Sequence, residues 1–141
     1  MLFLDSKFDE CVEEAGASNF FVVIDGALHT PDTARGTILP GVTRDSILTL
    51  AKEELGLEVV EAPLRSRQLH AASEAFCCGT GAAVTPVGSV NFEAGDVQAV
   101  KFGKAAGPHT KRLAGLLAAI QTGRRPDTRG WVRTACVAPG K

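Results

Sequence analysis

One continuous stretch, Glu14–Arg44, limits the possible folds of this chain more than any other part of its sequence. Its residues 20–24 form an apolar run typical of a buried strand, and Asp25-Gly26 is a dipeptide that favours a tight hairpin turn. Residues 27–30 suit the returning strand. A Pro-Gly pair at 40–41 then turns the chain just before an expected helix. The stretch therefore predicts a hairpin followed by a helix, within a mixed α/β domain.

Two helices are indicated by the spacing of apolar residues. In the first, Thr43 is the expected N-cap and Gly56 the expected stop. One face of this helix carries the apolar residues Ile47, Leu48, Ala51 and Leu55. The second helix has a clear amphipathic stripe and ends before Gly123. This stripe consists of Leu113, Leu116, Leu117 and Ile120.

A second loop of small residues, Gly79-Thr80-Gly81, separates two apolar runs, 75–78 and 83–90, each of which predicts a strand. Cys77 and Cys78 are adjacent in the first run, so their side chains should point to opposite faces of the sheet. We interpret them as two small hydrophobic residues, with a redox pair as the alternative.

The Pro-Gly loop at 40–41, the Gly79-Thr80-Gly81 loop and the carboxylate of Glu14 together suggest a ligand. Loops of small residues with threonines suit a phosphate group, because their backbone N–H groups can approach it closely. A carboxylate such as Glu14 suits a basic ring nitrogen at the other end of the ligand. Pyridoxal phosphate has this combination of groups.

The same stretch resembles the signature of the class IV aminotransferases, which are pyridoxal-phosphate enzymes of fold type IV. The matching positions are Glu14, Gly16, Asn19, Phe20, Phe21, Leu28, Thr30, Leu39, Gly41, Val42 and Arg44. Within that class, residues 36–46 and 76–89 are similar to the branched-chain amino-acid aminotransferases. The resemblance covers nearly the whole of this chain and only the C-terminal part of a full-length family member. It implies a barrel-like mixed sheet with outer helices.

The resemblance also implies roles for residues that bind the cofactor. Glu14 would hold the proton on the ring nitrogen, and Leu39 would lie against the face of the ring. Val42 and Thr43 would bind the phosphate at the start of the helix. Arg44 is interpreted as a structural residue that braces this loop.

Thr80 would bind the phosphate as well, and the N–H groups of Thr80 and Gly81 would bind the substrate carboxylate. The family usually has alanine at the position of Gly81, and glycine loosens the backbone there. No metal site is expected, and the histidines are interpreted as surface or core residues: His29, His70 and His109.

The resemblance implies transamination between leucine, isoleucine or valine and 2-oxoglutarate. The family's reaction needs a lysine that forms a Schiff base with the cofactor, upstream of the position of Glu14. Lys7 is the one lysine before Glu14 and stands at no family position, so we assign no catalytic residue. Two alternatives remain: a non-catalytic domain that associates with a full-length relative, and another class IV enzyme, either a D-amino-acid aminotransferase or an aminodeoxychorismate lyase.

The remaining expectations come from bulk composition. A chain of 141 residues can form one domain, which we place at 1–123, with a tail at 124–141 that only Trp131 anchors. A net charge of -1 gives no reason to expect a nucleic-acid partner, and no apolar run is long enough for a membrane helix. Cysteine usage suggests a reducing compartment. By its resemblance, the protein is expected in the cytoplasm, a mitochondrion or a plastid, and a targeting segment, if there is one, is expected outside this chain. The full-length family is expected to form homodimers.

Overall fold

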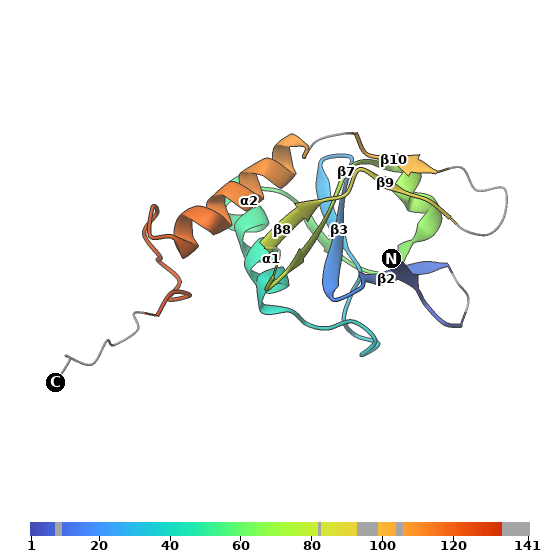
Figure 1. Cartoon of the computed structure of the whole chain (residues 1–141), viewed down its shortest axis with the longest axis horizontal. Helices are drawn as coiled ribbons and strands as arrows, with labels where there is room; N and C mark the ends of the chain where they lie inside the picture. The colour runs from blue at the N-terminus through green and yellow to red at the C-terminus, as the bar shows by residue number, and fades with distance from the viewer. Residues whose placement is uncertain (8–9, 82, 93–98, 104–105, 134–141) are drawn as a thin grey trace.

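The computed structural model describes residues 1–7, 10–81, 83–92, 99–103 and 106–133. Within these residues, an eight-stranded sheet is accompanied by a two-stranded sheet, two α-helices and one 3-10 helix (Figure 1). In chain order the elements are β1 (Leu2–Leu4), β2 (Cys11–Ala15), β3 (Ser18–Ile24), β4 (Ala27–Thr30), α1 (Val42–Leu55), β5 (Val59–Glu61), β6 (Leu64–Arg65), η1 (Ser66–Ala71), β7 (Ala72–Gly79), β8 (Ala83–Pro86), β9 (Ser89–Val90), β10 (Val100–Lys101) and α2 (Pro108–Gln121). The predicted mixed α/β class is confirmed.

Strand β3 lies at the centre of the large sheet. It pairs antiparallel with β2, β4 and β7, and β4 pairs parallel with β5. The hairpin between β3 and β4 turns at Asp25 and Gly26, whose φ angles are 49° and 81°. Two positive φ angles in succession are the geometry that an Asp-Gly turn favours, so this part of the sequence prediction is confirmed.

Helix α1 ends as predicted but begins differently. Gly56 adopts the left-handed conformation with φ of 64° and caps the C-terminus. The N-cap, however, is Gly41, and no side chain caps this end, so the prediction of Thr43 as N-cap was wrong. The turn at Pro40-Gly41 brings the chain into the helix two residues earlier, which places Thr43 inside the first turn.

The predicted single strand over residues 83–90 is also corrected. Strand β8 ends at Pro86, and Ser89–Val90 instead pairs with β10 in the small sheet. Proline has no N–H to donate to a ladder, so it favours the end of a strand. Beyond it, the N–H of Phe102 donates to the carbonyl of Gly88 at 2.8 Å, which draws this segment toward β10.

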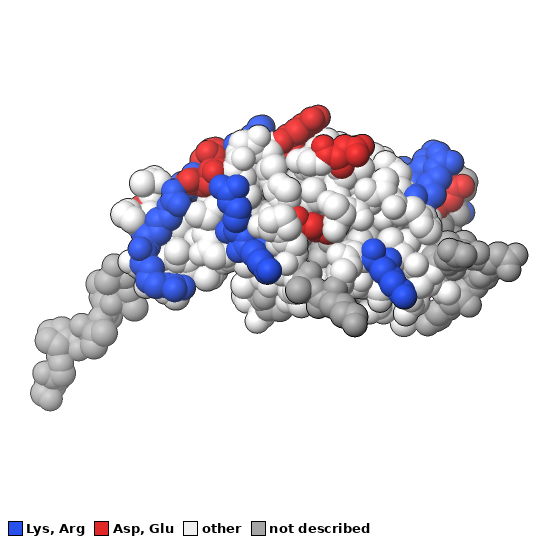
Figure 2. Space-filling model, turned by 90° about the horizontal axis from the view of Figure 1, so that it is seen from above, with Lys and Arg blue, Asp and Glu red and all other residues white. Residues whose placement is uncertain are grey.

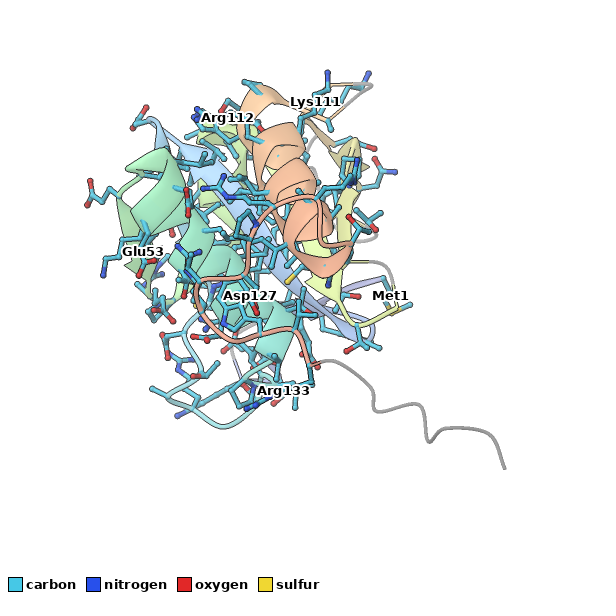
Figure 3. All side chains as sticks on the ribbon, turned by 90° about the vertical axis from the view of Figure 1, so that its left-hand side faces the viewer. Met1, Glu53, Lys111, Arg112, Asp127 and Arg133 are labelled. Carbon is cyan, nitrogen blue, oxygen red and sulfur yellow. The ribbon has the colours of Figure 1, made fainter. Side chains whose placement is uncertain are left out.

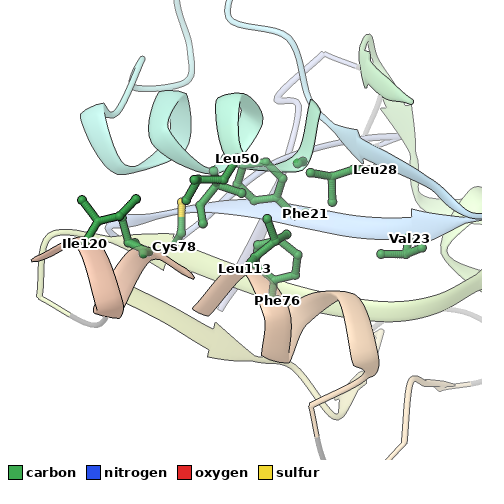
Figure 4. Packing of buried hydrophobic residues seen from close by; sticks show 11 residues of the cluster. Phe21, Val23, Leu28, Leu50, Phe76, Cys78, Leu113 and Ile120 are labelled. Carbon is green, nitrogen blue, oxygen red and sulfur yellow. The ribbon is translucent and has the colours of Figure 1, made fainter. Parts of the chain in front are cut away.

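The large sheet has apolar clusters on both faces. The cluster between the sheet and helices α1 and α2 is the covered face, and it includes Phe21 and Phe76, whose rings stack with centroids 4.9 Å apart (Figure 4). The opposite cluster, the open face, includes Phe20 and Val22 and meets η1, β9 and β10. Cys78 belongs to the covered face and Cys77 to the open face, which confirms their predicted opposite orientation.

The segment after α2 is held by more than the predicted Trp131. Arg125 forms an ion pair with Glu54 at 2.6 Å, and Arg129 forms ion pairs with both Glu53, at 2.6 Å, and Glu54, at 3.0 Å. The Arg129 guanidinium also lies 5.4 Å from the centre of the Trp131 ring. Figure 3 looks onto this end of the molecule, where the segment after α2 folds back toward α1. The residues of the predicted tail beyond 133, Cys136 among them, lie outside the described residues.

Charged side chains are mixed in sign over the described surface. In the view of Figure 2, basic and acidic side chains lie next to one another with wide uncharged areas between them. Among the described residues, no helix is long and apolar enough to cross a membrane, and no group of three or more His, Cys, Asp or Glu residues could hold a metal ion.

Candidate functional site

Three strands bring the candidate residues together at one end of the large sheet. Glu14 on β2 pairs in register with Asn19 on β3, and Asn19 pairs in register with Cys78 on β7. The turn between β2 and β3 therefore lies beside the end of β7. Residues from the two halves of the sequence motif meet here because β3 is central and pairs with both neighbours.

The loop before α1 is tied to this end of the sheet by Asn19. The buried Asn19 side chain donates from Nδ2 to the carbonyl of Leu39 at 2.8 Å. The N–H of Leu39 in turn lies 3.4 Å from Oε2 of Glu14. A methyl group added at Gly41 would lie only 2.5 Å from Oδ1 of Asn19, so this close approach requires glycine. Asn19 thus fixes the loop against the carboxylate.

The N-terminus of α1 opens at the same place. Its first intrahelical bond runs from the N–H of Asp45 to the carbonyl of Gly41, so the N–H groups of residues 42–44 precede the helical ladder. They stand at the positive end of the helix dipole. Two apolar side chains remain exposed beside them, Leu39 at 68% and Val42 at 85%. Thr43 is half-buried.

The turn after β7 also approaches the turn between β2 and β3. Gly79 passes so close to the β2–β3 turn that an added methyl group would lie 3.3 Å from Oγ of Ser18 and 3.4 Å from the carbonyl of Ala17. Thr80 and Gly81 follow directly and are exposed. The structure therefore brings the backbone of the Gly79-Thr80-Gly81 turn beside the strand end that carries Glu14.

Arg44 stabilises the loop that precedes α1. Its guanidinium is buried and donates from Nη2 to the carbonyl of Pro31 at 3.0 Å and to Oε2 of Glu61 at 2.8 Å. Its Nε has no hydrogen-bond partner among the described residues. These contacts join α1, β5 and the start of the loop, in agreement with the structural role expected for Arg44.

Sequence reasoning missed a buried carboxylate that orients α2. Glu74 on β7 is 4% exposed and accepts from the N–H of His109 at 3.1 Å and from the N–H of Thr110 at 2.9 Å. Its carboxylate also contacts His109 Nδ1 at 2.8 Å and the Thr110 hydroxyl at 2.7 Å. Burial alone would raise the pKa of Glu74, but these hydrogen bonds together hold it below its ordinary value. His109 was interpreted only as a surface or core residue, and no sequence signal links it to a residue so far away.

The adjacent thiols of Cys77 and Cys78, on β7, are both less acidic than an ordinary thiol. Burial raises the pKa of Cys77, and burial together with the neighbouring Cys77 raises the pKa of Cys78 to about 12. Both thiols therefore stay protonated at neutral pH. Cys11, Cys77 and Cys78 are free cysteines, as expected for small hydrophobic residues.

The donor set at this sheet end fits a ligand that has a phosphate and a basic ring nitrogen. An uncapped helix N-terminus offers free N–H groups to an anion, and a half-buried carboxylate stands one loop away. The missing Cβ atoms of Gly41 and Gly79 let one loop approach Asn19 on β3 and the other approach the turn between β2 and β3. These features suit pyridoxal phosphate.

Comparison with known proteins gives one consistent family. A family model described as amino-transferase class IV matches residues 2–90. A mitochondrial branched-chain-amino-acid aminotransferase 1 of Arabidopsis thaliana is 40% identical over 94% of this chain, which spans 33% of that relative. The solved branched-chain amino acid aminotransferase of Escherichia coli is 39% identical with a TM-score of 0.78, over 92% of this chain and 41% of that one.

A third comparison concerns a structure with bound cofactor. The branched-chain amino acid aminotransferase of Thermobaculum terrenum, solved in its PLP form, is 36% identical with a TM-score of 0.76, over 88% of this chain and 38% of that one. This chain therefore spans about a third to two-fifths of the length of the relatives it matches.

Proposed function

Because this chain belongs to the class IV aminotransferase family, we propose that it forms the cofactor-binding portion of a branched-chain amino-acid aminotransferase that uses pyridoxal phosphate. The reaction is transamination between leucine, isoleucine or valine and 2-oxoglutarate. One observation carries the proposal: Asn19 ties the loop at Leu39 to the sheet end that holds Glu14. This tie joins the two parts of the family motif.

When bound, the cofactor supplies an electron sink for the exchange of the amino group. Glu14 keeps the proton on the ring nitrogen by its negative charge, and Leu39 packs against the ring. The N–H groups of Val42 and Thr43 and the hydroxyl of Thr80 hold the phosphate. The N–H groups of Thr80 and Gly81 orient the substrate carboxylate.

No catalytic lysine is assigned within these 141 residues. The proposed role of this chain is therefore to bind the cofactor and position the substrate, while the lysine comes from family sequence that the chain does not span. For the complete protein we propose a homodimer in the cytoplasm, a mitochondrion or a plastid. This range is supported by relatives named as mitochondrial and chloroplastic.

The cofactor assignment is tested by equilibrium dialysis of the chain against pyridoxal phosphate, with pyridoxal as the ligand without phosphate. We expect saturable binding of pyridoxal phosphate and much weaker binding of pyridoxal. Thr80→Ala should weaken the binding by about 1.5–3 kcal/mol, because it removes a hydrogen bond to a charged group. Thr128→Ala, an exposed threonine in the segment after α2, is the matched control and should bind normally. Equal affinity in the two variants, or no saturable binding, would refute the assignment.

A further inference from the structure

The loop between β4 and α1, residues 31–41, brings Leu39 to the candidate cofactor site. Contacts already described fix it at two points: Arg44 binds its first carbonyl, and Asn19 binds the carbonyl of Leu39. Arg35 stands at the exposed tip of the loop between these two points. The position of the tip therefore depends on what Arg35 contacts.

Arg35 forms an ion pair with a buried carboxylate. Its Nη1 lies 3.9 Å from Oδ2 of Asp5, which directly follows β1, and the Asp5 side chain is only 7% exposed. The other oxygen, Oδ1, accepts from the N–H of Glu10 at 3.0 Å and from the N–H of Cys11 at 2.9 Å. One carboxylate therefore holds the start of β2 with one oxygen and the tip of the loop with the other.

The two segments that this carboxylate joins both carry candidate cofactor residues. Glu14 lies three residues after Cys11 on β2, and Leu39 lies four residues after Arg35 in the loop. Only a hollow of about 20 Å³ remains between the loop and the strands, room for about one water molecule, and Ile38 in its wall is 7% exposed. Because the packing is close, a displacement of the tip should be passed on to Leu39 rather than absorbed by empty space.

We propose that Arg35 is a positioning residue for the cofactor, which keeps Leu39 beside Glu14 through its ion pair with Asp5. It acts through Leu39 and not by contact with the ligand. The inference rests on the proposed function for the identity of that ligand. Affinity depends on the fraction of molecules in which the loop is in place, so loss of the pair raises the apparent Kd. A pair with one exposed partner is weak, and we expect a change of about two- to fivefold.

The first measurement is hydrogen exchange of the backbone N–H groups of residues 37–41 in the chain without cofactor. Arg35→Gln and Asp5→Asn should each speed this exchange by about two- to fivefold, because both remove the ion pair. Arg67→Gln, at an exposed arginine on η1, is the matched control and should leave it unchanged. If Arg35→Gln also leaves the exchange unchanged, the inference is wrong.

The second measurement is the affinity of each variant for pyridoxal phosphate, by equilibrium dialysis. Charge alone would give opposite results: Arg35→Gln removes a positive charge and would weaken binding of an anion, whereas Asp5→Asn removes a negative charge and would strengthen it. Positioning predicts that both variants bind about two- to fivefold more weakly. The double variant should be no weaker than the weaker single one, because the same pair is lost. Opposite signs, or unchanged affinity despite faster exchange, would overturn the inference.

Urea unfolding checks that each variant is folded. If Asp5→Asn is not, Arg35→Lys takes its place: it keeps the charge that pairs with Asp5, so its loop exchange should stay within about twofold of the wild type. Exchange as fast as in Arg35→Gln would then overturn the inference. No saturable binding by the wild-type chain would refute the proposed function and, with it, the ligand named here, whereas unchanged loop exchange would refute this inference alone. The two failures are therefore distinct.

Discussion

The covered face and the open face of the large sheet are built by the same strands but are closed to different extents. Adjacent residues supply the two faces, because side chains alternate along a strand: Phe21 and Cys78 enter one cluster, Phe20 and Cys77 the other. On the covered face, α1 and α2 lie side by side over the strands (Figure 1). On the open face, η1 and the small sheet leave a hollow of about 660 Å³, whose lining includes Leu4, Phe20, Cys77 and Val90. The strands therefore supply apolar residues equally, and the other segments decide which face is closed.

The candidate site lies at the ends of β2, β3 and β7, where it borders both faces of the sheet. The loop before α1 is held on the side of the covered face, because it leads directly into α1 and because Arg44 of that helix donates to the carbonyl of Pro31. From the open face the site adjoins the hollow. The candidate site is therefore bordered by helix-side contacts on one face and by the hollow on the other.

The strongest test of this comparison is a pair of adjacent substitutions on β3. Phe21→Ala removes a fully buried ring that stacks on Phe76, and should lower the free energy of unfolding by about 3–5 kcal/mol. Phe20→Ala removes an equally buried ring whose outer edge borders the hollow, so fewer packing contacts are lost. We expect its cost to be lower by about 1 kcal/mol or more. Urea unfolding of both variants measures the difference, and equal losses would show that the two faces are packed alike.

A second test concerns the carboxylate that fastens α2 to the covered face. Glu74→Gln replaces a charged acceptor of several hydrogen bonds by a neutral amide with one acceptor oxygen, and should cost about 2 kcal/mol at pH 7. Glu58→Gln, at an exposed position, is the control and should change stability little. An equally small effect of Glu74→Gln would mean that helix packing alone holds α2 in place.

The same carboxylate predicts how stability depends on pH. The pKa of Glu74 is lowered in the folded state, so its contribution is complete above the pKa of an unfolded glutamate and is lost as the pH falls through the lower folded value. The wild type should therefore lose stability in acid more steeply than Glu74→Gln. If the free energies of unfolding of the two proteins fell equally as the pH was lowered, this assignment would be wrong.

Local signals in the sequence predicted the local features of this fold. The Asp25-Gly26 turn, the stop at Gly56 and the apolar stripe of α2 each depend on residues that are close in sequence. The contacts that were missed join distant residues: Glu74 reaches Thr110 across the fold, and Arg129 reaches Glu53 on α1. Neither hydrophobic periodicity nor a turn-forming dipeptide indicates such long-range pairs.

In the candidate site too, the sequence indicated local features and did not indicate long-range contacts. Spacing and resemblance suggested the candidate residues for the chemistry, Glu14 and Thr80 among them. They did not suggest how the loop before α1 is fixed to the sheet, which depends on the Asn19 side chain donating to the carbonyl of Leu39 and on the space left at Gly41. The start of α1 was misplaced because a threonine two residues inside the helix looks like a cap, whereas the turn at Pro40-Gly41 sets the boundary.

A third test compares the two cysteines. Cys78→Ser puts a hydroxyl among buried apolar residues of the covered face, where it should cost about 1–3 kcal/mol. Cys77→Ser puts the same hydroxyl in the half-buried wall of the hollow, where water can reach it, and should cost less than about 1 kcal/mol. Thermal unfolding of the two variants measures the contrast. A larger loss for Cys77→Ser would mean that the hollow is closed in solution.

The smallest expected effect concerns the segment that follows α2 and extends the cover on the helix side. Arg129→Ala removes two ion pairs with α1 and the contact of the guanidinium with the Trp131 ring. These groups are near the surface, where solvent and salt weaken ion pairs, so global stability should fall less than in Cys78→Ser. Hydrogen exchange of residues 124–132 should nevertheless become faster, because local opening no longer breaks these contacts. Arg133→Ala, at an exposed position, is the control and should leave exchange unchanged. High salt should also speed the exchange of this segment in the wild type, because salt screens the ion pairs. If neither Arg129→Ala nor high salt made exchange faster, the packing of Trp131 rather than charge would hold this segment to the covered face.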